Sequence, residues 1–297
     1  MKTFSLLLIS IIMIFVVSCQ QQSQRQQGQI PEITLDSFQL LAVNVMPAYN
    51  SISDIFQLFQ HVEVSYYPEI VNNIENIERY MNNELLTAAN IGVYIADLAY
   101  AYSTGSENAA IPSYFAAMEL SQNIQLAMTF LVVFLENYSV TEAELDTILL
   151  KLEQDLQTSA AYLTGEEEVR LYSALLTGTY IEKVFLLYSI ISKYSENSVP
   201  ENEIIENIQR LIWIASGQKK ALEKLNQVID GYEIPEEYQL YHYELSNLEK
   251  QMNETPFLMD TSIVRTVEIP GSPEFVNLYN EIIRIRKFIT EPELVGK

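Results

Sequence analysis

The sequence has little cysteine, glycine or proline. Cys19 is the only cysteine among 297 residues, so a disulfide framework and a thiolate metal site are both excluded. The hydrophobic core must therefore stabilise the fold without cross-links. Only 9 glycines and 10 prolines interrupt the chain, and this scarcity favours long helices.

Basic residues are also few. The chain has 17 Lys and Arg against 39 Asp and Glu, which gives a net charge of −22. A chain this acidic is repelled by phosphate backbones and by anionic lipid headgroups, so we expect no nucleic-acid partner. The hydrophobic content of 48% is too high for a disordered chain.

The usual catalytic motifs are absent too. The sequence has no Gly-rich phosphate loop, no HExxH, no GxSxG and no CxxC, so it predicts no cofactor and no metal site. Its two histidines are His61, at the end of a short amphipathic segment, and His242, on an expected helix. Both fit a surface or core-edge position better than a ligand position.

The N-terminus has the pattern of a secretory signal. Lys2 precedes an apolar stretch, Phe4 to Val17, which is shorter than the roughly 20 residues of a membrane-spanning helix. The next residues, Ser18 and Cys19, complete a four-residue pattern that resembles the lipobox of bacterial lipoproteins. This resemblance implies that residues 1–18 are cleaved off and that Cys19 carries a lipid that holds the chain on a membrane. The alternative is an uncleaved anchor helix with an incidental cysteine.

Residues 19–50 are expected to link the lipid to a folded domain. Gln20 to Gln29 is Gln-rich and typical of a flexible tether, and a short helix is expected from Leu35 to Val45. The residue after Cys19 is not Asp, and no acid occurs before Glu32. We therefore expect an outer-membrane lipoprotein that faces the periplasm.

From residue 51 to 297 the pattern predicts an all-α domain, either an antiparallel helical bundle or an array of helical hairpins, with a possible subdivision near 196–200. Capping residues recur where helices should begin. The helices expected from caps and periodicity are 78–102, 107–137, 141–162, 164–194, 198–230 and 272–289. Phe257 to Pro270 is the one stretch that looks extended, and we expect a long loop or a short strand pair there.

The expected helix 78–102 is the most informative. Two apolar faces indicate a helix surrounded by neighbours, and Gly92 indicates close approach by another backbone. The segment Gly92-Val-Tyr-Ile is echoed at Gly178-Thr-Tyr-Ile, which suggests two similar packing sites or a coincidence of composition. A narrow polar stripe runs between the two faces and consists of Asn83, Thr87, Asn90, Tyr94 and Asp97.

Three stretches carry a resemblance to a known family. They are Ser53-Asp-Ile-Phe, then Asn90-Ile-Gly-Val-Tyr-Ile-Ala-Asp-Leu-Ala-Tyr, then Gly178-Thr-Tyr-Ile-Glu. Over roughly Ser51 to Tyr194 the chain resembles a family of uncharacterised helical lipoproteins of Bacteroides-type bacteria. A second glycine at the position of Ile95 and a Gly-Gly-Trp at 178–180 are usual in that family, so this chain resembles a divergent member. The resemblance implies a helical fold and an envelope location, and no activity.

Three carboxylates stand out because they lie in apolar helices, where a charge needs a partner or a shifted pKa. They are Asp97, Glu119 and Glu182. Three functions remain open: a non-enzymatic helical scaffold that binds an envelope protein, a small-ligand-binding lipoprotein, and a hydrolase using these carboxylates. The groove expected for a ligand comprises Asn83, Asn90, Tyr94, Asp97, Glu119, Tyr180 and Glu182.

Overall fold

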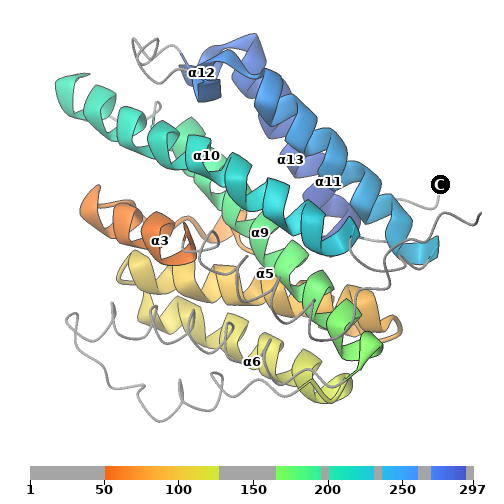
Figure 1. Ribbon diagram of the computed structural model, residues 1–297. Coiled ribbons are helices and arrows are strands. Elements are labelled where there is room, and N and C mark those ends of the chain that lie inside the picture. The colour runs from red at the N-terminus through yellow and green to blue at the C-terminus, as the bar shows by residue number, and fades with distance from the viewer. Residues whose placement is uncertain (1–50, 127–164, 195–200, 231–235, 260–268, 292–297) are drawn as a thin grey trace, which may run out of the picture. The chain divides into compact units, whose positions relative to one another are not determined.

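The computed structural model describes residues 51–126, 165–194, 201–230, 236–259 and 269–291 (Figure 1). These residues contain helices and no β-strand, which confirms the predicted all-α class. They all belong to one unit, Thr34–Lys297. The α-helices are α3 (Ser51–His61), α4 (Ile77–Tyr80), α5 (Glu84–Ser103), α6 (Glu107–Asn123), α9 (Glu166–Tyr194), α10 (Glu201–Asp230), α11 (Glu236–Glu254), α12 (Pro256–Met259) and α13 (Pro273–Thr290). Short 3₁₀ turns cover Pro68–Ile70, Ile74–Asn76 and Ile269–Gly271.

The core is built on α5 and α9, which pack more extensively on each other than any other pair of described helices. Both are apolar on all sides, and nearly every residue of α5 from Leu86 onward is buried. By length and composition alone each could span a membrane, yet 94% and 100% of their most apolar windows are buried inside the fold. Burial by other helices accounts for an all-round apolar helix without a membrane.

Two glycines set how closely these helices approach. A Cβ at Gly92 would overlap the carbonyl oxygen of Leu175 and lie 2.6 Å from the nitrogen of Thr179. A Cβ at Gly178 would overlap the carbonyl oxygen of Ala89. The close approach predicted at Gly92 is therefore confirmed. The two echoed segments form the two sides of one crossing, not two separate packing sites.

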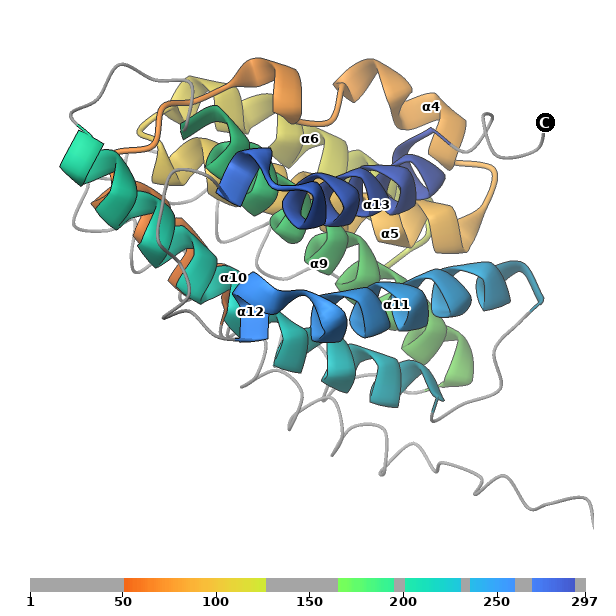
Figure 2. The same ribbon diagram turned by 90° about the horizontal axis from the view of Figure 1, so that it is seen from above.

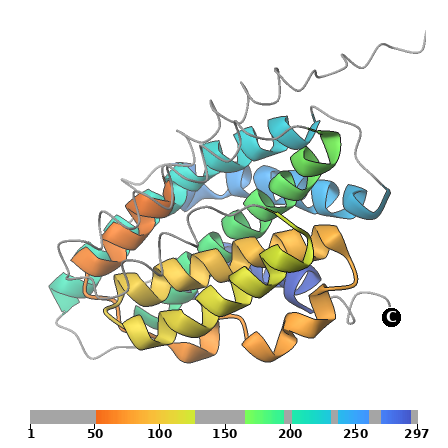
Figure 3. The ribbon, with the colours of Figure 1, turned by 90° about the horizontal axis from the view of Figure 1, so that it is seen from below.

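The remaining helices surround this pair. α6 packs along α5, while α10 and α13 pack on α9, and α11 contacts both α10 and α13 (Figures 1 and 2). Figure 3 shows α3 beside α10 and α6 beside α5, in agreement with their contacts. Residues before and after 195–200 thus share one core.

Most predicted helix ends agree with the structure; two helix ends and one stretch expected to be extended differ. α9, α10 and α13 end at or within one residue of the expected position, and the Ser272 side chain caps α13 by accepting a hydrogen bond from the Phe275 nitrogen at 3.2 Å. The expected helix 78–102 is wrong at its start, because the chain breaks after Tyr80 and begins again at Glu84.

The other two differences lie further along the chain. The expected helix 107–137 ends at Asn123, since Gln125 has a positive φ that stops the helix. Phe257 to Met259 is helical, not extended, and forms most of the short α12. The helices expected at Leu35 to Val45 and at 141–162 lie outside the described residues.

Candidate functional site

The polar stripe of α5 binds the irregular segment that precedes the helix. The Thr87 hydroxyl donates to the carbonyl of Tyr80 at 2.7 Å. The Tyr94 hydroxyl donates to the carbonyl of Asn73 at 3.0 Å. Both side chains are fully buried, and the Tyr94 hydroxyl reaches the carbonyl of the exposed residue Asn73.

The pattern continues along the helix. The Asn72 backbone N–H donates to Asp97 Oδ2 at 2.9 Å. One turn further, the Tyr100 hydroxyl accepts from the Tyr67 N–H at 3.0 Å and donates to the Ser65 carbonyl at 3.1 Å. Backbone groups of Ser65 to Tyr80 have few partners of their own kind, because the segment is neither a long helix nor a strand. The stripe and Tyr100, one turn beyond it, supply those partners.

Asn90 binds backbone groups too, and one of them belongs to the C-terminal helix α13. Its Nδ2 donates to the Leu86 carbonyl at 2.9 Å and to the Ile289 carbonyl at 2.8 Å, close to the end of α13. The Tyr80 hydroxyl donates to the neighbouring Thr290 carbonyl at 2.9 Å. The last carbonyls of a helix lack partners within the helix, and here two side chains from earlier elements bind them.

A buried ionic cluster joins three helices. Arg286 on α13 forms two hydrogen bonds to Glu182 on α9, from Nε at 2.6 Å and from a terminal nitrogen at 2.8 Å. Glu182 and Asp97 on α5 are both fully buried, and the Arg286 side chain is 13% exposed. The guanidinium also stacks over the Phe185 ring at 4.2 Å. The guanidinium of Arg286 thus binds Glu182 directly and acts electrostatically on Asp97.

Within this cluster, the pKa of Asp97 is raised. Burial and the neighbouring Glu182 raise the pKa of Asp97 well above its usual range, although Arg286 and the Asn72 N–H lower it. Oδ1 of Asp97 accepts no hydrogen bond from the described residues, which leaves room for a proton on that oxygen. Burial likewise raises the pKa of Tyr94. We therefore interpret the cluster as a Glu182–Arg286 salt bridge beside a neutral Asp97.

The structure brings together some of the predicted groove residues and separates others. Asp97, Glu182 and Tyr94 are electrostatic neighbours. Tyr180 turns to the opposite side of α9, where its hydroxyl donates to the carbonyl of Gln218 on α10 at 3.1 Å. Glu119 is exposed on α6. Asn83 lies at the start of α5 and caps it by accepting from the Leu86 nitrogen at 2.9 Å.

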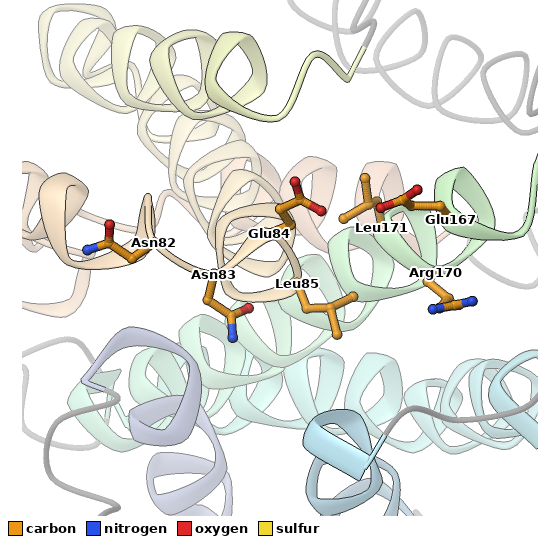
Figure 4. A pocket seen from close by; sticks show the side chains of 7 residues that line it. All are labelled: Asn82, Asn83, Glu84, Leu85, Glu167, Arg170 and Leu171. Atoms are coloured by element: carbon orange, nitrogen blue, oxygen red, sulfur yellow. The ribbon is translucent and has the colours of Figure 1, made fainter.

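A cavity of about 280 Å³ lies elsewhere, where the starts of α5 and α9 meet (Figure 4). Of the predicted groove residues only Asn83 lines it. Glu84 and Arg170 add charges of opposite sign, and Leu171 adds an apolar wall. The full lining is Asn82, Asn83, Glu84, Leu85, Glu167, Arg170 and Leu171.

Sequence reasoning missed Arg286, Asn72 and Tyr80. A signal existed for Arg286, because it lies four residues after Ile282 and three before Ile289, both of which are buried on the core face of α13. No comparable signal marked Asn72, whose contribution is a backbone N–H in an irregular segment.

The described residues contain no group of three His, Cys, Asp or Glu side chains that could hold a metal ion. The polar contacts described above anchor backbone groups through buried side chains. Two guanidinium groups bind carboxylates, Arg286 at Glu182 and Arg284 at Glu244 and Glu281. Comparisons of this chain with protein-family models, with curated proteins and with solved structures give no match.

Proposed function

We propose that this chain is a lipid-anchored envelope protein whose helical domain is a non-enzymatic scaffold that binds another protein. The observation that carries the proposal is the occupation of the α5 stripe. The side chains that a ligand or substrate would need donate to or accept from the chain's own backbone, at Tyr80, Asn73, Asn72 and Ile289. A catalytic or ligand-binding stripe would keep such groups available to a cavity.

The buried cluster supports the same view. A carboxylate that acts as a general acid or base must reach the proton it transfers. Asp97 and Glu182 have no exposed surface. Their contacts instead connect α5, α9 and α13, which is a structural task. The hydrolase that uses Asp97, Glu119 and Glu182 is therefore the least supported of the three functions.

Small-ligand binding is supported by one feature, the cavity at the starts of α5 and α9. It is lined by two acids, one Arg and two Asn, which would suit a small polar molecule. Arg170→Ala and Asn83→Ala should both weaken the binding of such a ligand. If neither changes the melting temperature shift produced by any small polar metabolite, the cavity is not a binding site.

The anchor is tested by metabolic labelling with palmitate. Wild type should be labelled, and Cys19→Ser should be unlabelled and either unprocessed or soluble. Equal labelling of the two would remove the anchor from the proposal. Protease added to intact cells should leave the protein whole if the domain faces the periplasm, and permeabilised cells should lose it.

The scaffold is tested by affinity isolation of the lipidated protein after cross-linking in its native membrane. An envelope protein should be recovered in near-stoichiometric amount. Recovery of the chain alone, with a bound small molecule, would favour the ligand-binding alternative.

A further inference from the structure

The side of α6 that faces away from α5 carries large apolar side chains. α6 packs along α5 at one side of the described helices (Figures 1 and 3). Most of the residues that it buries are small, and two of them are serines. They are Ala110, Ser113, Tyr114, Ala116, Ala117, Leu120 and Ser121. A helix whose outer side met only water would instead place its polar residues there and its larger apolar residues inside.

We call this side the α6 outer face. Phe115 is 57% exposed on it, and its ring lies edge-on against Tyr114 with 5.3 Å between the ring centres. Ile111 and Met118 lie one turn before and one turn after Phe115 and are half-buried, while Pro112 is exposed. Apolar side chains thus follow one another along successive turns of the same face. Such a continuous patch marks an interaction site more often than a single exposed residue does.

Pro112 gives this face a second feature. A proline inside a helix is strongly unfavourable, because its ring is bulky and it has no N–H. Pro112 therefore cannot donate to the carbonyl of Asn108, which lies one turn earlier on the same outer face and is exposed. A donor on a bound partner can reach this carbonyl.

The charges of α6 are all negative. Glu107 and Glu119 are exposed, and neither α5 nor α6 contains a Lys, Arg or His. The turn Ile74–Asn76 and the short α4 also contact α6, and they add Glu75 and Glu78 against one base, Arg79. An apolar face with acidic neighbours is complementary to a surface that combines apolar and basic side chains.

We propose that the α6 outer face is the surface by which this scaffold binds its protein partner, and that the partner presents an apolar segment flanked by lysine or arginine. The inference rests on the proposed function and names the chemistry of the partner. Phe115 would pack among the partner's apolar side chains, since aromatic residues are enriched at the centres of interfaces. The basic side chains would pair with Glu107 and Glu119 and donate to the Asn108 carbonyl.

Two other occupants fit the charges of this face less well. A second copy would bring another Glu107 and Glu119 and no base of α6, and like charges across an interface are costly. The chain's own residues 127–164, which follow α6, would also add negative charge. They contain one base, Lys151, and the six acids Glu136, Glu142, Glu144, Asp146, Glu153 and Asp155.

Photo-cross-linking from position 115 tests the proposal on the full chain in its native membrane. Phe115 is replaced by p-benzoylphenylalanine, and a matched control carries the same probe in place of Trp213, an exposed aromatic residue of α10. Irradiation should join position 115 to another protein, and position 213 to that protein at much lower yield. Mass spectrometry of the joined peptides should find Lys or Arg next to apolar residues on the partner's side.

Two charge reversals complete the test. Glu119→Lys should lower the cross-linked fraction from position 115 about fivefold, since the loss of one exposed ion pair changes affinity by about that factor. Glu223→Lys makes the same change at an exposed position of α10 and should leave the yield unchanged. Thermal unfolding followed by circular dichroism should be the same for all variants, because each substituted side chain is exposed.

Three results would overturn the inference: a cross-link from position 115 to residues 127–164, a cross-link to a second copy, or equal yields from positions 115 and 213. Absence of any cross-link from position 115 has two readings, which affinity isolation separates. If isolation still recovers an envelope protein, the inference about α6 is wrong and the proposed function stands. If isolation recovers none, the proposed function fails as well.

Discussion

The α5–α9 crossing and the outer face of α10 both contain a glycine in mid-helix, but in opposite surroundings. At the crossing, Gly92 and Gly178 lie against the backbone of the facing helix, and no side chain would fit. On α10, a Cβ at Gly217 would meet no atom of the described residues within 4 Å. The same sequence signal thus marks a contact already made in one place and an open surface in the other.

Polar side chains differ between the two regions in the same way. Along α5 they are buried, and their hydrogen bonds go to the chain's own backbone. On the outer face of α10, Lys220 and Glu223 are exposed, as is Trp213. The comparison indicates that the polar side chains of α5 contribute to the fold, whereas Trp213 on α10 is exposed to solvent.

The largest effect is expected at the crossing. Gly92→Leu should lower the free energy of unfolding by about 3 kcal/mol or more, because the added side chain would push α5 and α9 apart. Gly217→Leu is the matched control, since it makes the same change in an open position, and it should cost far less. Chemical denaturation followed by circular dichroism measures both. Equal losses would remove the distinction between the two glycines.

An intermediate effect is expected at Asp97, and it depends on pH. The pKa of Asp97 is raised in the folded state, so proton binding at Asp97 contributes to the free energy of unfolding. This contribution is fully present below about pH 4 and is lost as pH rises through the folded pKa. Asp97→Asn keeps an acceptor for the Asn72 N–H and needs no proton. The free energy of unfolding of Asp97→Asn should therefore increase relative to that of wild type as pH rises.

The control for Asp97 is Glu119→Gln, which removes a carboxylate from an exposed position on α6. Its stability should follow wild type in parallel across the same pH range. If Asp97→Asn also runs parallel to wild type, Asp97 is not the neutral member of the cluster.

The smallest effect is expected at Gly217. Gly217→Ala should raise the free energy of unfolding by about 0.5–1 kcal/mol, since alanine is the better helix former and its methyl group would meet nothing. Urea titration provides the measurement. A loss of stability would mean that Gly217 is in contact with another part of the chain.

The fold was largely predictable from periodicity and caps. The caps near Thr164 and at Ser272, and the all-round apolar character of α5 and α9, gave the correct helices because local hydrogen bonding and burial act within a few residues. Breaks were harder to predict. The break between Tyr80 and Glu84 depends on Thr87 and Asn83 bonding to backbone groups, which periodicity does not register.

The candidate site was predictable only in part. Asp97 and Glu182 were identified because acids in apolar helices are conspicuous, but their partner Arg286 lies 104 residues beyond Glu182. Tyr180 and Glu119 were grouped with them on sequence character alone. The structure places Tyr180 against α10 and Glu119 in solvent, because the direction of each side chain depends on which face of its helix meets a neighbour.

The central claim is that the α5 stripe binds the chain's own backbone rather than a ligand. Amide hydrogen exchange at Asn72 and Tyr67 tests it most directly. Both lie in an irregular segment; Asn72 donates to Asp97 of the stripe, and Tyr67 donates to Tyr100, one turn beyond the stripe. Both amides should be strongly protected in wild type. Asp97→Ala should remove protection at Asn72, and Tyr100→Phe should remove it at Tyr67. Rapid exchange of both amides in wild type would contradict the account and return the stripe to the list of candidate ligand sites.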